Sequence, residues 1–158
     1  MSALPSKLAA VIDALAAFSD PTDRANVILG YADEFKEVPA SVATRPFPAR
    51  HQVPQCESDA YVWAVERPDG TLKLYFAVEN PSGVSARALA AILDKTLSGL
   101  TPRAIASVPG DVVEAIFRQN LSMGKGLGLR SMVEAVRALA RSALRGGASG
   151  VPPGPPRQ

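Results

Sequence analysis

One stretch of the chain, AYVWAVERPDGTLKLYFAVE at residues 60–79, restricts the fold more than any other. Two runs of aromatic and β-branched residues flank Asp69-Gly70, a dipeptide typical of two-residue turns, so an antiparallel hairpin is predicted. Taking that dipeptide as the loop places three facing pairs on one side: Val65–Leu74, Trp63–Phe76 and Tyr61–Val78. That side is the predicted core, anchored by Tyr61 and Trp63, whereas Glu66 opposite Lys73 is predicted to face solvent.

Helical patterns lie on both sides of the hairpin. Residues 5–18 carry apolar residues at helical spacing, and a second helix is predicted from Asp20, as its N-cap, to about Glu37. Later stripes predict a helix over residues 85–99, short helical segments from Thr101 and over 111–119, and a long last helix whose inward face runs from Leu129 to Leu139. The predicted fold class is α+β, a small antiparallel sheet with a hairpin at 60–79, covered by N- and C-terminal helices.

The domain organisation follows from length and composition. A chain of 158 residues suits one compact domain, predicted at residues 1–145. Residues 146–158 are rich in proline and glycine with almost no large apolar residue, so this tail is predicted to be disordered. Residues 38–55 carry four prolines and form an extended connection, in which a short strand near Gln52-Val53 would add an edge to the sheet.

Composition excludes several classes of function. The net charge of +2 is too small to argue for nucleic acid binding. No stretch approaches the roughly 18 uninterrupted apolar residues of a membrane helix, and the N-terminus lacks the continuous apolar core of a secretory signal. The single cysteine excludes an internal disulfide framework and a thiolate zinc cluster built from this chain alone. We therefore predict a cytoplasmic protein with no nucleic acid or membrane partner.

That single cysteine, Cys56, is the main candidate for chemistry. It follows the proline-rich connection, in the stretch QVPQCESDAYVW, where its neighbours are polar. Such a position fits a nucleophilic or sulfur-carrying thiol, but a free cysteine is also often a small buried hydrophobe. Basic residues upstream (Arg45, Arg50 and His51) favour the thiolate, whereas Glu57 and Asp59 oppose it. The residues alone leave both interpretations open.

Other candidate sites are weaker. His51 is the only histidine, and five residues of extended chain place it beyond hydrogen-bond reach of Cys56, which argues against a Cys-His hydrolase. GKGLG at residues 124–128 lacks the spacing of a phosphate-binding loop and does not follow a strand. It is predicted to be a flexible lead-in to the last helix, where Lys125 is available to an acidic partner. No constellation of metal ligands is apparent.

The stretch VPQCESDAYVW resembles the active loop of the SufE family, sulfur-acceptor proteins that work with cysteine desulfurases in iron–sulfur cluster assembly. The matching residues are Val53, Pro54, Gln55, Cys56, Ser58, Tyr61 and Trp63. The resemblance extends over about residues 5–145 and includes the order of helices and hairpin, a Leu-x-x-Leu-Thr-Pro sequence at 97–102, and Gly128 in the last helix. Many members carry glycine where this chain has Gln55, arginine near Lys125, and an acidic pair at the positions of Asn80 and Ser82.

The resemblance implies a mechanism. Cys56 would take sulfur from the persulfide of a pyridoxal-phosphate-dependent desulfurase, stimulate that enzyme, and pass the sulfur to an iron–sulfur scaffold complex. The protein would carry a persulfide as a partner of the desulfurase rather than act as a stand-alone enzyme. It would bind no cofactor itself, and it would be a monomer or weak homodimer. Gln55, Glu57, Ser58 and Lys125 are the predicted partner contacts. Two alternatives remain, a noncatalytic interaction module with an incidental cysteine and a thiol redox sensor.

Overall fold

The computed structural model describes residues 4–121 and 126–146. The helices and strands of this part of the chain are α1 (Ser6–Ala16), α2 (Pro21–Asp33), η1 (Ala49–His51), β1 (Ala60–Glu66), β2 (Leu72–Val78), α3 (Val84–Leu97), α4 (Pro102–Ala106), α5 (Val112–Phe117), η2 (Arg118–Asn120) and α7 (Gly126–Leu144). None of the helices described is long and apolar enough to cross a membrane. The predicted tail, 146–158, lies outside the described residues except for Gly146.

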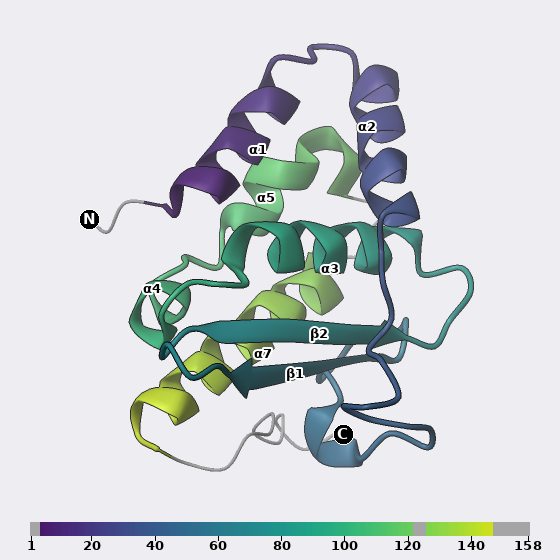
Figure 1. Cartoon of the computed structure of the whole chain (residues 1–158). Coiled ribbons are helices and arrows are strands. Elements are labelled where there is room, and N and C mark those ends of the chain that lie inside the picture. Colours follow the sequence, from purple (N-terminus) through teal and green to yellow (C-terminus); the bar gives the residue numbers. More distant parts are fainter. Residues whose placement is uncertain (1–3, 122–125, 147–158) are drawn as a thin grey trace.

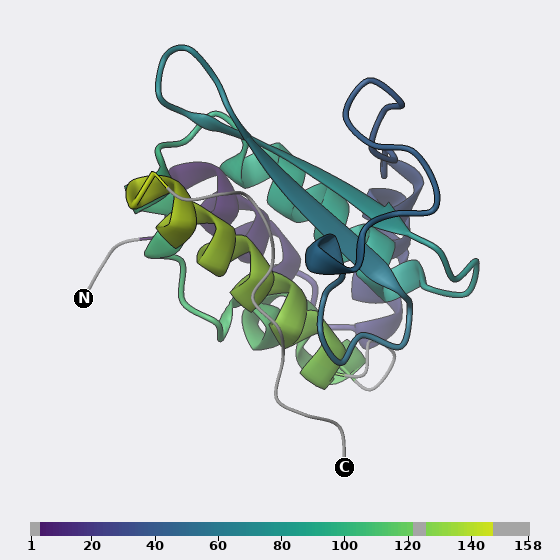
Figure 2. The ribbon, with the colours of Figure 1, turned by 90° about the horizontal axis from the view of Figure 1, so that it is seen from below.

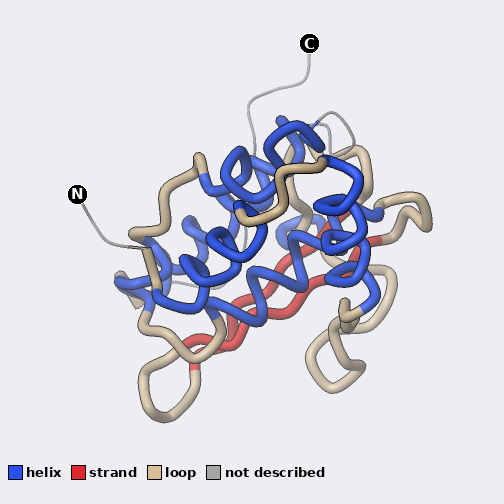
Figure 3. The backbone as a smooth tube through the Cα atoms, turned by 90° about the horizontal axis from the view of Figure 1, so that it is seen from above, coloured by secondary structure: helices blue, strands red, loops and turns tan. Residues whose placement is uncertain are grey.

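The helices gather on one side of the hairpin (Figures 1 and 3). Helix α3 packs against β2 and α7 packs against β1, so these two helices cover the inner face of the sheet. Helices α1 and α2 contact α3 from above, as Figure 1 is drawn. The predicted α+β class is confirmed, with a two-stranded antiparallel sheet that α3 and α7 cover, while the N-terminal helices pack on α3. Asp20 caps α2 as predicted, since its Oδ1 accepts a hydrogen bond from the Thr22 N–H at 2.9 Å.

The predicted hairpin register is wrong by one residue. Trp63 faces Tyr75, and Val62 faces Phe76. The turn explains the shift, because the Arg67 N–H donates to the Thr71 carbonyl at 2.8 Å and the Gly70 N–H donates to the Arg67 carbonyl at 2.9 Å. Gly70 has φ 84°, so the chain forms a longer loop with a left-handed glycine instead of the two-residue turn. Lys73 consequently faces Val65 and forms an ion pair with Asp94 of α3, not with Glu66.

The shift changes which residues make the core. Ala60 and Val62 of β1 and Leu74, Phe76 and Val78 of β2 join the main core beneath the helices. Tyr61 and Trp63 lie on the opposite face, where residues 38–47 cover them and form a second, smaller apolar cluster around Val38, Trp63 and Ala77. The second face is therefore also buried at Trp63 and Ala77, although Val65 is 40% exposed. The predicted role of Tyr61 and Trp63 in the helix-covered core is corrected.

Candidate functional site

Cys56 lies in a tightly held loop, residues 53–59, which leads into β1. At its start the Val53 N–H donates to the Ala60 carbonyl at 2.8 Å. At its end the carbonyls of Asp59 and Ser58 accept hydrogen bonds from the N–H groups of Glu79 and Asn80, both at 3.1 Å. Only an isolated bridge, Gln52 to Tyr61, forms where the sequence suggests a short edge strand. The loop is thus fastened to both strands of the hairpin, and its tip lies at the end of the sheet.

Two glycines make room for the loop. A Cβ on Gly128, in the first turn of α7, would lie 3.3 Å from the Cα of Cys56 and 3.4 Å from the Gln55 carbonyl oxygen. A Cβ on Gly83, just before α3, would lie 3.0 Å from the Cβ of Ser58 and 2.9 Å from Cγ1 of Val78. Real Cβ atoms rarely approach other atoms so closely, so the loop occupies space that only glycine leaves open. Figure 2 shows it descending from η1 to the start of α7.

The loop borders a pocket of about 370 Å³. Its walls are residues 55–58, Asn80, residues 82–86 at the start of α3, and residues 127–129 at the start of α7. Cys56 itself is partly buried. The thiol therefore lies neither in the core nor on an open surface, but at the side of a cavity that three segments of the chain share.

Burial raises the pKa of the Cys56 thiol above its ordinary value. Hydrogen bonding from the backbone N–H groups of Ser58 and Ala60 and from the Ser58 hydroxyl opposes this shift, whereas the charge of Asp59 adds to it. The arginines upstream, which the sequence suggested would favour the thiolate, are not among its causes. At neutral pH the resting thiol is therefore mostly protonated, and its nucleophilic thiolate is scarce.

The predicted partner contacts occupy different environments. Gln55 and Glu57 are exposed on the two sides of Cys56, whereas Ser58 is half-buried against Gly83. Lys125 lies outside the described residues. The sequence reasoning missed Leu127, which borders the pocket and is 59% exposed. Its position two residues before the inward-facing Leu129 places it on the outer side of α7, and this helical spacing is the signal that would have found it.

Comparison with protein families identifies the whole domain. Residues 9–140 match the family model described as the SufE Fe-S metabolism associated domain. The chain belongs to the SufE family. A solution structure of a hypothetical protein from Thermus thermophilus is similar, with 25% sequence identity and a TM-score of 0.67 over 90% of this chain and 99% of the other. No curated protein matches the chain. The SufE fold and an association with iron–sulfur metabolism therefore hold for this protein.

The residue before Cys56 has a left-handed backbone conformation. Gln55 has φ 60°, in the left-handed region that glycine adopts at little cost. A glycine would therefore suit this position. A glutamine there costs roughly 1–2 kcal/mol of backbone strain. Asp59, at the other end of the loop, has φ 50°, which is also left-handed but which aspartate adopts more readily than glutamine.

His51 has a structural place in this SufE domain. It is 3% exposed, its Nδ1–H donates to the Val62 carbonyl at 3.0 Å, and its ring stacks on Trp63 with centroids 5.1 Å apart. Burial lowers its pKa below the ordinary value. The ring thus has a structural role against the outward-facing side of β1.

A pH dependence of stability follows from His51, the only histidine in the chain. The unfolded chain takes up a proton near pH 6.5, whereas the folded chain, whose His51 pKa is lowered, resists protonation. We expect the free energy of unfolding to fall as the pH drops from about 7.5 to about 5.5. Urea denaturation of wild type and His51→Gln at both pH values measures the effect. An equal pH dependence in the two proteins would contradict this assignment.

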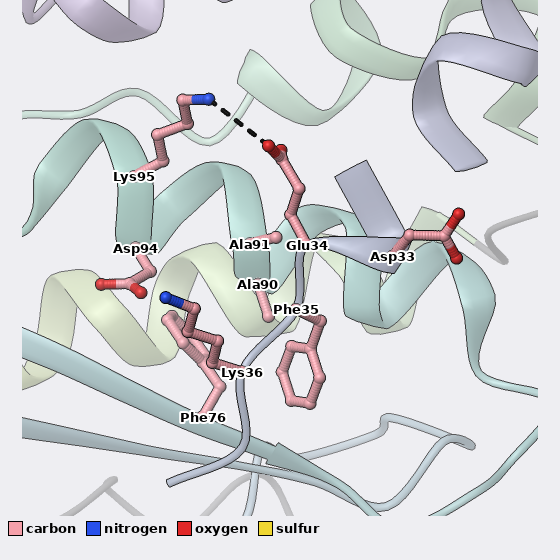
Figure 4. A pocket seen from close by; sticks show the side chains of 9 residues that line it. All are labelled: Asp33, Glu34, Phe35, Lys36, Phe76, Ala90, Ala91, Asp94 and Lys95. Carbon is pink, nitrogen blue, oxygen red and sulfur yellow. Dashed lines mark ion pairs between the residues drawn. The ribbon is translucent and has the colours of Figure 1, made fainter. Parts of the chain in front are cut away.

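A second pocket, also about 370 Å³, lies between the end of α2 and α3 (Figure 4). Charged side chains of both signs line it. Three of them form ion pairs, since Lys95 lies 3.8 Å from Glu34 and Asp94 lies 2.5 Å from Lys73. This pairing leaves little net charge to select an ionic ligand. Within the described residues no group of three or more His, Cys, Asp or Glu side chains is placed to hold a metal ion.

Proposed function

We propose that this protein accepts sulfur from a pyridoxal-phosphate-dependent cysteine desulfurase in the cytoplasm and thereby activates that enzyme. The sulfur would be held as a persulfide on Cys56 and passed to an iron–sulfur scaffold complex. The observation that carries the proposal is the position of the only cysteine, which lies in the stretch that resembles the SufE active loop and borders a pocket. The pyridoxal phosphate belongs to the partner.

The transfer is a thiol–persulfide exchange. The Cys56 thiolate attacks the terminal sulfur of the desulfurase persulfide, the sulfur–sulfur bond on the desulfurase breaks, and the desulfurase cysteine leaves as a thiolate. One sulfur–sulfur bond forms while another breaks, so no external oxidant or reductant is needed. Removal of the sulfur frees the desulfurase cysteine for a further turnover, which accounts for activation.

The state of the thiol at rest suits such a carrier. Because burial raises the pKa of Cys56, the unpartnered protein keeps its thiol protonated and poorly reactive. The exposed residues next to it, Gln55, Glu57 and Leu127, offer polar and apolar contacts to a docking protein. We expect docking to move the loop out of its pocket, which removes the effect of burial and lowers the pKa. A thiol redox sensor is disfavoured, since such cysteines have low pKa values.

Mass spectrometry tests sulfur acceptance directly. Wild type and Cys56→Ser are incubated separately with a cysteine desulfurase and cysteine, and the intact masses are compared. We expect wild type to gain the mass of one sulfur atom and the variant to gain none. The release of alanine, the product of desulfuration, measures stimulation in parallel. Full stimulation by Cys56→Ser would show that sulfur acceptance is not the mechanism and would favour a noncatalytic interaction module.

A further inference from the structure

The N-terminus of α3 borders the pocket of Cys56 and has free hydrogen-bond donors. Helix α3 has fourteen residues, no side chain caps it, and no acidic residue lies in its first turn. The N–H groups of Val84 and Arg87 donate to backbone carbonyls. Those of Ser85 and Ala86 have no backbone acceptor among the described residues. Unpaired N–H groups and the helix dipole together favour an anion at such a position.

The side chain of Ser85 provides an independent observation. The buried polar or charged residues of the described chain are Arg24, His51, Ser85, Thr96 and Asn120. All except Ser85 take part in a hydrogen bond. Ser85 is 7% exposed, it borders the same pocket as Cys56, and its hydroxyl has no hydrogen-bond partner in residues 4–121 and 126–146. The Ser85 oxygen is not among the enclosed polar atoms that lack a partner in the described residues, so it remains open to the pocket and to a ligand bound there.

The carbonyl that a helical serine commonly contacts is bonded here by another side chain. A serine hydroxyl within a helix commonly donates to the carbonyl four residues earlier, which for Ser85 is Pro81. The Pro81 carbonyl instead accepts a hydrogen bond from Nη2 of Arg87 at 2.9 Å, and Nη1 of Arg87 donates to the Asn80 carbonyl at 3.2 Å. The guanidinium thus takes the carbonyls of the turn before α3, and the Ser85 hydroxyl remains available to a group in the pocket.

We propose that this pocket binds the terminal sulfur of a persulfide on Cys56 as an anion, with the Ser85 hydroxyl and the first-turn N–H groups of α3 as donors. The inference rests on the proposed function in one respect, namely that Cys56 carries sulfur. A persulfide ionises more readily than its parent thiol, and its charge lies on the terminal sulfur, one bond further from the loop. The site would hold the sulfur in its ionised form between its arrival and its delivery.

Inorganic polysulfide loads the full-length protein without a desulfurase. The Cys56 thiolate attacks one end of the polysulfide, a sulfur–sulfur bond of the polysulfide breaks, and a polysulfide dianion shorter by one sulfur leaves. The rate of alkylation of loaded protein as a function of pH then gives the pKa of the persulfide. Wild type is compared with Ser85→Ala, which lacks the hydroxyl, with Ser85→Thr, which retains one, and with Ser131→Ala, a helical serine outside the pocket.

We expect Ser85→Ala to raise the pKa of the persulfide by about one unit, since a hydrogen bond to a charged acceptor is lost. Ser85→Thr and Ser131→Ala should retain the wild-type value. The charged neighbours Glu57 and Asp59 are unchanged in all four proteins. An equal pKa in wild type and Ser85→Ala would overturn the site. If Ser85→Ala fails to fold, Ser85→Gly removes the same hydroxyl and gives the same comparison.

Two further outcomes separate this inference from the proposed function. If the thiol of unloaded Cys56 shows the same shift in Ser85→Ala as the persulfide does, the donors serve the thiolate, and a terminal-sulfur site is excluded. If polysulfide loading shows the expected shift but a desulfurase transfers no sulfur to wild type, the pocket site stands and the proposed function fails. If the desulfurase transfers sulfur to wild type but Ser85→Ala leaves the pKa of the persulfide unchanged, the pocket site is overturned and the proposed function stands.

Discussion

Gly128→Val is expected to increase the rate at which Cys56 reacts with iodoacetamide at neutral pH by about tenfold or more. The Cβ alone would lie 3.3 Å from the Cα of Cys56, and valine adds two methyl groups to it. Overpacking costs typically 1–3 kcal/mol, and each 1.4 kcal/mol is a factor of ten in an equilibrium constant. The loop relieves this cost by moving away from α7, which exposes the thiol and removes the burial that raises its pKa.

Gly30→Val is the matched control. Gly30 also lies within a helix, α2, but nothing lies within 4 Å of the Cβ that it would carry. Both variants therefore exchange a helical glycine for valine, and only one fills the space beside the cysteine. Circular dichroism establishes that each is folded. If the two variants react at the wild-type rate, contact with α7 does not restrain Cys56.

Gly128→Val is also expected to favour sulfur transfer from a desulfurase. If a desulfurase must displace the loop before it transfers sulfur, Gly128→Val reaches half-maximal stimulation at a lower concentration than wild type. A loop that is freed but no longer shaped for the partner gives faster alkylation with weaker stimulation. Comparing the alkylation rate of Cys56 with the stimulation of the desulfurase therefore distinguishes exposure of the thiol from recognition by the partner.

The positions of the helices could be predicted from sequence because they depend on local signals. Asp20 and Pro21 mark the start of α2, and the apolar stripe from Leu129 to Leu139 identifies the inner face of α7. The hairpin is also evident from sequence, but its register is not. Asp69-Gly70 suits a two-residue turn as well as the longer loop that forms, and the alternation of apolar residues predicts a single buried face.

That prediction fails because a segment distant in sequence buries the second face. Val38 is held beside β2 by donating its N–H to the Phe76 carbonyl at 2.8 Å, and Arg45 forms ion pairs with Glu37 and Glu79. The proline content predicts an extended chain here, but nothing local indicates where an extended chain lies. For the site, the sequence supplied Cys56 and its loop. The places of Gly83, Gly128, Leu127 and Ser85 beside the loop and its pocket became apparent only when three segments were brought together.

Trp63→Ala should destabilise the protein by about 3–5 kcal/mol, the usual cost of removing a buried aromatic side chain. Trp63 is 5% exposed and lies between Phe47, His51 and Tyr61, with ring centroids 5.1, 5.1 and 6.2 Å away. Its main contacts are with the segment that leads to the Cys56 loop. We therefore expect the backbone amides of residues 42–52 to exchange hydrogen faster than the rest of the sheet, beyond the effect of lower global stability.

Val62→Ala is the comparison that separates the two faces of β1. Val62 immediately precedes Trp63 in the strand and is fully buried in the main core beneath the helices. Its truncation should raise exchange throughout the domain, with no preference for residues 42–52. If Trp63→Ala gave the same uniform pattern, Trp63 would belong to the main core, as the two-residue turn predicts. Because residues 49–53 lead into the cysteine loop, selective loosening in Trp63→Ala should also speed alkylation of Cys56, which ties this outer cluster to the reactivity of the thiol.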